Sequence, residues 1–174
     1  DLIIGDQNGK LFFFKNTSSP GEALNFVPVV YPYMNIGVGV SATPQIVDIN
    51  GDGKGDLVIG ERTGNADING RCSNLTYFEN VGTPGAALFI PDATVAPNTQ
   101  CFGRVLFDIQ IGLPQYSTPA VFRTKEGLVM MMGNDRGTLL LYDDLPNGKT
   151  GSISLVDDHF GFLDVGNRSA PALA

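Results

Sequence analysis

An acidic stretch in the middle of the sequence has the residue types and spacing to bind a cation. The stretch DINGDGKGDLVIG, from Asp48 to Gly60, places Asp48, Asn50, Asp52 and Asp56 within nine residues and continues into an apolar run. Three carboxylates this close together repel one another, so we expect something to compensate their charge. Because Asp48, Asn50 and Asp52 alternate along the chain, their oxygens can converge when the backbone curls.

The residues between the acids suit a calcium ion. Gly51 and Gly53 accept positive φ at low cost and so permit the curl. An all-oxygen set with several carboxylates suits Ca²⁺ far better than Zn²⁺ or copper. The alternative is a solvated turn that is merely rich in Asp and Gly. The predicted calcium ligands are Asp48, Asn50, Asp52, the backbone carbonyl of Lys54, and Asp56.

The residues after the loop exclude a helix-flanked calcium site. An EF-hand begins in a similar way but needs Glu at the twelfth position and a helix on each side. Counted from Asp48, the twelfth position is Ile59, which lies inside an apolar run typical of a strand. The same observation argues against a dockerin, and we expect the loop to join two strands.

These strands belong to a pattern that recurs along the chain. In each copy an apolar run is followed by a glycine, three polar residues and a second glycine, and then by another apolar run. Such a pattern is typical of a β-hairpin with a glycine-bearing turn. The second copy carries an insertion that contains Cys72. The glycine pairs are Gly5/Gly9, Gly60/Gly64 and Gly133/Gly137.

A second marker repeats in step with the first. The segments SATPQIVD, STPAVF and SAPALA begin at Ser41, Ser117 and Ser169, and their prolines are 75 and 52 residues apart. Runs such as LIIG and VMMM are apolar throughout, as in strands that are buried on both faces. The longer spacing includes the insertion in the second copy, so the underlying unit has about 50 residues. Short strands in units of this length indicate propeller blades. We therefore expect an all-β fold, a β-propeller fragment with about three four-stranded blades; the alternative is a β-sandwich.

The two markers divide the chain into units. We expect the unit that carries the calcium loop to end in an outer strand, either at residues 87–91 or at residues 104–111. In the third copy Arg123 stands where Asp48 would be, so we predict no calcium there. Further blades would come from a longer parent chain or from partner subunits. The predicted units are a partial blade without its first strand (residues 1–40), a blade with the calcium loop (41–112), a blade without it (113–168) and the opening strand of a further blade (169–174).

The motif resembles a known repeat family. ATPQIVDINGDGKGDLVIG, followed by YFENVG, resembles the FG-GAP/VCBS repeat of integrin-α-like β-propellers. The resemblance covers nearly the whole chain, although only one copy keeps the full loop. It implies a secreted or cell-surface protein, with calcium held by the same five residues. Asp1 occupies the position in the first copy that Asp56 occupies in the second, which implies that a similar loop once preceded it.

Composition and cysteine usage limit the remaining possibilities. The net charge of −7 argues against a nucleic-acid surface, and no apolar run is long enough for a transmembrane helix. The two cysteines, Cys72 and Cys101, lie in polar segments. We expect them to form a disulfide, since the chain otherwise has the character of a secreted protein; two free thiols are the alternative.

We expect a non-catalytic, calcium-stabilised module for adhesion or for recognition of a protein or glycan. His159 is the only histidine, and the adjacent acids Asp143/Asp144 and Asp157/Asp158 fit turns better than a catalytic pair. The alternatives are the propeller portion of a secreted polysaccharide-degrading enzyme, and a lectin. The predicted binding surface combines residues 65–74 and 92–103. Three tyrosines could stack on sugars or fill gaps between blades: Tyr31, Tyr33 and Tyr116.

Overall fold

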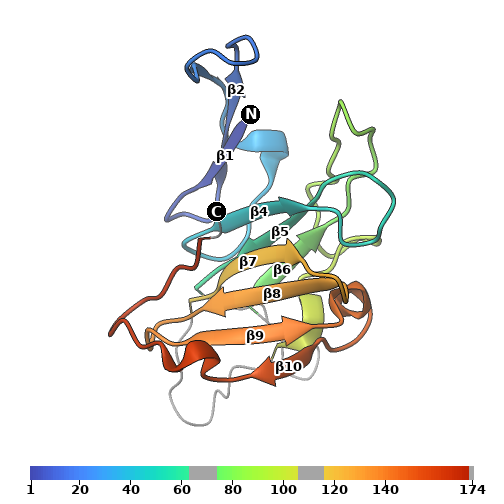
Figure 1. The fold of residues 1–174 in the computed structure, drawn as a ribbon. Coiled ribbons are helices and arrows are strands. Elements are labelled where there is room, and N and C mark those ends of the chain that lie inside the picture. The colour runs from blue at the N-terminus through green and yellow to red at the C-terminus, as the bar shows by residue number, and fades with distance from the viewer. Residues whose placement is uncertain (63–73, 106–115, 173–174) are drawn as a thin grey trace.

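The computed structural model describes residues 1–62, 74–105 and 116–172 (Figure 1). Its regular elements are strands and short 3₁₀ turns, so the predicted all-β class is confirmed. In these ranges no helical turn has the length and hydrophobicity of a membrane span. The strands are β1 (Leu2–Gly5), β2 (Leu11–Asn16), β3 (Phe26–Val30), β4 (Thr43–Val47), β5 (Asp56–Gly60), β6 (Leu75–Phe78), β7 (Thr118–Arg123), β8 (Leu128–Gly133), β9 (Leu139–Asp143) and β10 (Ser154–Asp157). The 3₁₀ turns are η1 (Tyr33–Asn35), η2 (Phe102–Arg104), η4 (Leu145–Lys149) and η5 (Phe160–Phe162).

The strands form three antiparallel sheets that follow one another along the chain. The first sheet has the order β1-β2-β3, the second β4-β5-β6, and the third β7-β8-β9-β10. Each sheet is therefore a simple meander of consecutive strands (Figure 1). Among the described residues, only the third sheet has the four strands that we predicted for a full unit. The predicted boundaries of the units stay a prediction.

Among the described residues, the outer edge of the second sheet carries a single bridge. Thr99 pairs with Tyr77 through reciprocal N–H···O bonds of 2.8 and 3.0 Å. The prediction of a strand at residues 87–91 is wrong, and Arg104 belongs to η2; residues 106–111 lie outside the described ranges. The side-chain amide of Asn98 donates to the carbonyls of Ile90 and Asp92, each at 3.0 Å. These bonds hold the preceding chain in a loop instead of a ladder.

A close backbone contact joins each sheet to the chain segment that begins the next repeat. We call the glycine that ends β1, β5 or β8 the junction glycine. The carbonyl of the residue after it accepts a hydrogen bond from the N–H of the residue two places before the next repeat's proline. A Cβ on the junction glycine would lie 2.0–2.1 Å from the carbonyl oxygen of that donor residue, so only glycine fits. The three sets of glycine, acceptor and donor are Gly5, Asp6 and Ala42; Gly60, Glu61 and Ser117; and Gly133, Asn134 and Ser169.

Two hydrophobic clusters fill the spaces between the sheets. The cluster between the first and second sheets includes Leu11, Ile36, Leu57 and Ile59. The cluster between the second and third sheets is larger and consists of Ile49, Val58, Leu75, Tyr77, Phe102, Val105, Val121, Leu128, Met130, Met132, Tyr142, Leu145 and Ile153. β5 contributes alternate residues to both clusters and is buried along its whole length. The acidic loop directly precedes β5, so the C-terminal end of the loop is fixed by the most buried strand of the fold.

Candidate metal centre

The acidic loop, residues 48–55, links two paired antiparallel strands, as the sequence predicted. The ladder between β4 and β5 closes with Val47 opposite Asp56. Gly51 and Gly53 have φ values of 78° and 81°, so the left-handed turns expected at these glycines are present. Ile49, which is 1% exposed, packs in the cluster between the second and third sheets and anchors the start of the loop.

The loop closes around the carboxylate of Asp48. Its Oδ1 accepts the backbone N–H of Gly51 at 2.7 Å and of Asp52 at 3.1 Å, and its Oδ2 accepts that of Gly53 at 3.0 Å. The Oδ1 of Asn50 also accepts the N–H of Asp52, at 3.0 Å. Successive N–H groups that point at one centre form a concave, partly positive surface. The backbone thus offsets part of the charge that the sequence crowds into this loop.

Lys54 supplies a positive charge within the same loop. Its Nζ lies 2.9 Å from Oδ2 of Asp52 and donates to the carbonyl oxygen of Asn80 at 2.7 Å. The bond from Lys54 holds the pKa of the Asp52 carboxyl below its usual value. Sequence analysis assigned only the carbonyl of Lys54 and missed this role of the ammonium group. The second partner of the ammonium group, Asn80, is 26 residues away, so the loop motif carries no signal for that bond.

Asp56 lies beneath the loop and is fully buried. Its two carboxylate oxygens accept backbone N–H bonds from Asn80 at 3.0 Å and from Ile49 at 3.1 Å. Burial raises the pKa of the Asp56 carboxyl, and these two hydrogen bonds oppose the shift. A buried carboxylate of this kind is costly to ionise and would be stabilised by a cation nearby.

Asn80 ties the loop to the end of β6. Its side-chain amide donates to the carbonyl of Gly55 at 3.1 Å, and its Oδ1 accepts the N–H groups of Gly82 at 3.0 Å and Leu88 at 3.1 Å. Together with the bond from its backbone N–H to Asp56, these side-chain bonds of Asn80 connect three segments of the second sheet. Asn80 lies in the YFENVG motif, to which sequence analysis assigned no role at the loop.

The predicted ligands fit calcium in donor type and in loop conformation. All of them offer oxygen, and the glycines adopt the conformations that a curled cation loop requires. In the parts of the chain that the structure describes, however, no three acidic, histidine or cysteine side chains come close enough together to form a metal cluster. Asp48 and Asp52 belong to the loop itself, whereas Asp56 bonds to backbone groups beneath it. The calcium site therefore stays a prediction.

Two other predicted features lie partly outside the described residues. Cys101 immediately precedes η2, whereas Cys72 lies in the range 63–73, so the predicted Cys72–Cys101 disulfide stays a prediction. The same holds for the proposed binding surface, because most of residues 65–74 fall in that range.

The three tyrosines considered for sugar stacking have different surroundings. Tyr33 is buried and stacks on Phe13 with the ring centroids 4.9 Å apart, so it fills the space between the first two sheets. Tyr31 is exposed, stacks on Phe12 at 4.2 Å and donates its hydroxyl to Asp6. The ring of Tyr116 is contacted by two guanidinium groups, those of Arg62 at 5.4 Å and Arg168 at 4.5 Å.

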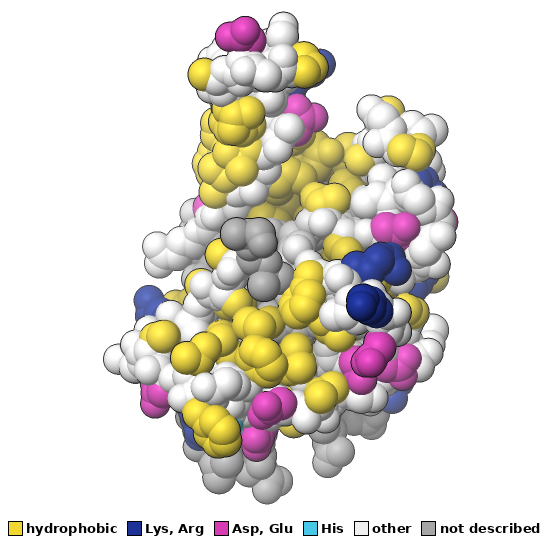
Figure 2. Space-filling model, in the orientation of Figure 1, with side chains coloured by type: hydrophobic (Ala, Val, Ile, Leu, Met, Phe, Trp, Pro, Cys, Tyr) yellow, Lys and Arg dark blue, Asp and Glu magenta, His cyan; other side chains and the backbone are white. Residues whose placement is uncertain are grey.

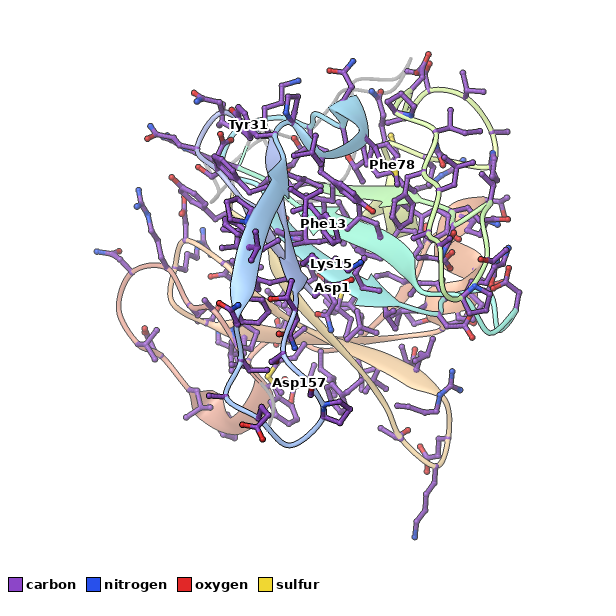
Figure 3. The ribbon with its side chains drawn as sticks, turned by 90° about the horizontal axis from the view of Figure 1, so that it is seen from above. Asp1, Phe13, Lys15, Tyr31, Phe78 and Asp157 are labelled. Atoms are coloured by element: carbon purple, nitrogen blue, oxygen red, sulfur yellow. The ribbon has the colours of Figure 1, made fainter. Side chains whose placement is uncertain are left out.

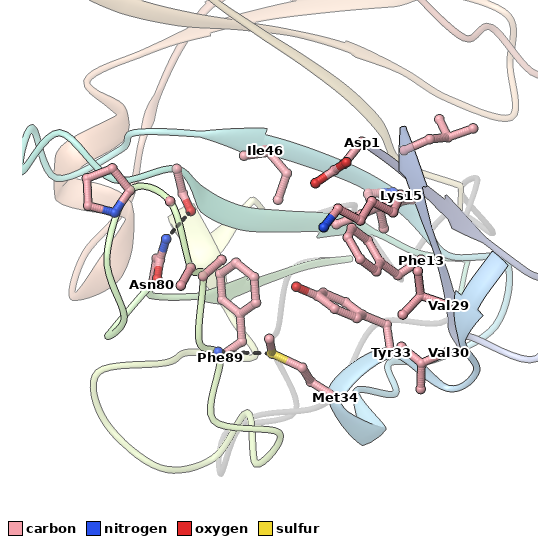
Figure 4. Close-up of a pocket in the computed structure, with 18 residues that line it drawn as sticks. Asp1, Phe13, Lys15, Val29, Val30, Tyr33, Met34, Ile46, Asn80 and Phe89 are labelled. Carbon is pink, nitrogen blue, oxygen red and sulfur yellow. Dashed lines mark hydrogen bonds between the residues drawn. The ribbon is translucent and has the colours of Figure 1, made fainter. Parts of the chain in front are cut away.

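A groove of about 950 Å³ opens between the first sheet and the second. Phe13, Tyr33 and Phe89 form an aromatic wall, and the charged groups of Asp1 and Lys15 lie at the groove (Figure 4). Seen from above, Phe13, Lys15 and Asp1 lie on the side of the first sheet nearer to the second sheet (Figure 3). A mainly apolar groove with a few polar groups is the usual form of a small-ligand site.

Comparison of the chain with protein-family models, with curated proteins and with solved structures gives no match. The arguments on function therefore rest on the residues and contacts described above.

Proposed function

We propose that the chain is a calcium-stabilised β-propeller module of the FG-GAP/VCBS type, non-catalytic, and used outside the cell for adhesion or recognition. The observation that carries this proposal is the acidic loop between β4 and β5, which curls around Asp48 through left-handed glycines and contains oxygen donors throughout. The blade arrangement is supported by three consecutive meander sheets with the same glycine contact at each junction.

In this proposal the ion is held by Asp48, Asn50, Asp52, the carbonyl of Lys54, and Asp56. Calcium would neutralise the crowded carboxylates and fix the connection between two strands of the second sheet. The loop residues already hold their backbone in the curled form, which lowers the entropic cost of binding. A site of moderate affinity would be filled by the millimolar calcium found outside cells, which is why we propose an extracellular location.

The recognition role rests on the groove between the first two sheets. Its aromatic wall and the charges of Asp1 and Lys15 suit a ligand with both apolar and polar groups. The enzyme alternative would need acid–base groups gathered on one surface. The only histidine, His159, is exposed and bonds to Asp158 of its own turn at 3.1 Å.

Thermal unfolding in calcium and in chelator tests the proposal. With free calcium at about one hundred times the dissociation constant, binding stabilises the folded state by about 2.7 kcal/mol. For a chain of this size that corresponds to an increase in Tm of roughly 5–10 °C. Asp48→Asn should remove most of the calcium-dependent increase. Asp92→Asn, which changes an acid that caps a different exposed loop, should keep it. An equal Tm in calcium and chelator for the unmodified chain would contradict the proposal.

A further inference from the structure

The acidic loop carries a positive charge of its own. The chain has 18 acidic and 11 basic residues, and on the face shown in Figure 2 the Lys and Arg side chains form small groups instead of a broad basic patch. In the part of the chain that the structure describes, Lys54 alone forms an ion pair with an acid of this loop, with its Nζ 2.9 Å from Oδ2 of Asp52. The positive charge at this loop is therefore supplied locally.

Two partners from different segments hold the ammonium group of Lys54. Asp52 lies in the middle of the loop, whereas the carbonyl oxygen of Asn80, which accepts a bond of 2.7 Å, lies just after β6. The side chains of Lys54 and Asp52 are only 22% and 33% exposed. An ion pair with fixed geometry and reduced contact with water is screened less than a freely moving pair on the surface. Lys54 thus forms a bridge between the loop and β6.

This bridge also reaches the end of the loop. The backbone N–H of Asn80 donates to Asp56 at 3.0 Å, and its side-chain amide donates to the carbonyl of Gly55 at 3.1 Å (Figure 4). Lys54 therefore links the acid in the middle of the loop to the residue that holds the end of the loop. Through these bonds the chain's own groups hold the loop closed.

The carboxylate of Asp52 is engaged by Lys54 on both of its oxygens. Oδ1 accepts the backbone N–H of Lys54 at 2.9 Å, and Oδ2 contacts the ammonium group. Asp52 is also one of the predicted calcium ligands, and calcium binds carboxylate oxygens at about 2.3–2.6 Å. An ion held by Asp52 would be a near neighbour of the ammonium group, and two positive charges this close repel each other. Calcium binding and the Lys54–Asp52 pair therefore oppose each other.

From this arrangement we infer that Lys54 is a tethered counter-ion that regulates the calcium site, an inference whose calcium-dependent half rests on the proposed function. Without calcium, the ammonium group neutralises Asp52 and ties the loop to Asn80. When calcium binds, the ammonium group leaves Asp52, and this exchange lowers the net affinity for the ion. Because the affinity of such sites depends on the charge of the ligand set, Lys54 keeps the affinity in the moderate range that responds to millimolar calcium.

Lys54→Met tests both halves of the inference. The substitution removes the ammonium group and keeps the backbone carbonyl that is a predicted ligand. In chelator, the variant should have a Tm about 2–4 °C lower than the unmodified chain, as expected for the loss of one weak ionic contact in a chain of this size. In titration calorimetry, its Kd for calcium should be lower by about three- to tenfold. A residue that merely supports the fold would instead weaken stability and calcium binding together.

Lys125→Met is the matched control. Lys125 is exposed in the turn between β7 and β8, which is the counterpart of the acidic loop in the third sheet. The control makes the same change in net charge, so it separates the local effect of Lys54 from a general one. Its Tm in chelator and its Kd for calcium should match those of the unmodified chain. Circular dichroism of both variants checks that they are folded.

The outcomes separate failure of this inference from failure of the proposed function. If neither the unmodified chain nor Lys54→Met binds calcium, the proposed function is refuted and the regulation of calcium binding by Lys54 is refuted with it. If the unmodified chain binds calcium and Lys54→Met binds it no more tightly, only the counter-ion role is overturned. The counter-ion role is also overturned if Lys54→Met has the same Tm in chelator as the unmodified chain.

Discussion

Strands β1 and β5 have almost the same sequence in different surroundings. The two segments read DLIIG and DLVIG, and each begins with an aspartate and ends with a junction glycine. The aspartate even has the same partner in both places, because Asp1 accepts the N–H of Asn16 and Asp56 accepts that of Asn80, each at 3.0 Å. Yet β5 is buried throughout, whereas Leu2 and Ile4 of β1 are exposed.

The difference between these strands comes from their neighbours. β5 lies between β4 and β6 and has a sheet on each side, whereas in the part of the chain that the structure describes β1 is an edge strand with a sheet on one side. The shared sequence is thus sufficient for the hairpin and for the aspartate contact. Burial, and the stability that it provides, depends on the sheets that pack around each copy.

The largest expected effect separates the two strands directly. Ile59→Ala removes a fully buried side chain and should lower the free energy of unfolding by about 2–5 kcal/mol. Ile4→Ala, at the matching position of β1, should cost about 1 kcal/mol or less, because much of that side chain already contacts water. Urea unfolding at concentrations where the chain is monomeric measures both. Equal losses would mean that β1 is covered in solution by a part of the chain that we have not identified.

The junction glycines should be equally sensitive in both strands. A Cβ at Gly5 or Gly60 would lie 2.0 Å from a backbone carbonyl of the next sheet, so alanine at either position must push the sheets apart. We expect each substitution to lower the free energy of unfolding by about 1–3 kcal/mol or more. Gly85→Ala, where a Cβ would meet nothing within 4 Å, is the control and should be neutral or slightly stabilising. A neutral effect of Gly60→Ala would contradict the close junction.

How much of the fold could be predicted from the sequence depends on how far apart in the sequence the interacting residues are. The hairpins were predictable because apolar runs and glycine turns are local signals. An outer strand at residues 87–91 was wrongly predicted, because Asn98 holds that segment in a loop through bonds to Ile90 and Asp92; residues 106–111 of the alternative lie outside the described ranges. The 3₁₀ turn η1 was missed as well, since Met34 and Asn35 take positive φ without the glycine that would signal it.

The features of the candidate site also divide into local ones, which could be predicted, and contacts between distant residues, which could not. The spacing of the acids and the curl at Gly51 and Gly53 could be predicted, because both are properties of one loop. The bond from the Lys54 ammonium group to Asn80 and the bonds of Asn80 to Gly55 and Asp56 could not, because they join residues 24 to 26 positions apart. Sequence patterns therefore identify the candidate loop, whereas the groups that compensate its charge come from the folded sheet.

A smaller effect is expected from the hydroxyl bonds across the junctions. Thr43 in β4 donates its hydroxyl to the carbonyl of Ser117, and Thr118 in β7 donates to that of Ser169, both at 2.8 Å. Replacing either by valine keeps the shape and removes the bond, which should cost about 0.5–1.5 kcal/mol. Thr83→Val, in an exposed turn, serves as the control for the hydroxyl-to-methyl change. If both junction variants have the same urea midpoint as the control, these bonds add nothing to the stability of the fold.

The smallest effect, and the most specific, concerns the acids that follow β1 and β5. Asp6 and Glu61 occupy the same place after the junction glycine, but their pKa values move in opposite directions. The backbone bond from Lys10 lowers the pKa of the partly exposed Asp6 carboxyl. Burial raises the pKa of the Glu61 carboxyl, although Thr76 donates a hydrogen bond to it at 3.1 Å. The two acids should therefore give stability opposite dependences on pH.

The sign of each dependence follows from which state binds protons more tightly. For Asp6 the ionised form is favoured by folding, so its contribution is present above pH 3.8 and is lost as the pH falls through the lower folded pKa. For Glu61 the folded state favours the proton, so stability decreases as the pH rises from 4.5 through the higher folded pKa. At neutral pH, Asp6→Asn should lower Tm and Glu61→Gln should raise it. Melting curves from neutral to acidic pH should show both differences shrinking as the acids protonate; differences of the same sign would refute the contrast.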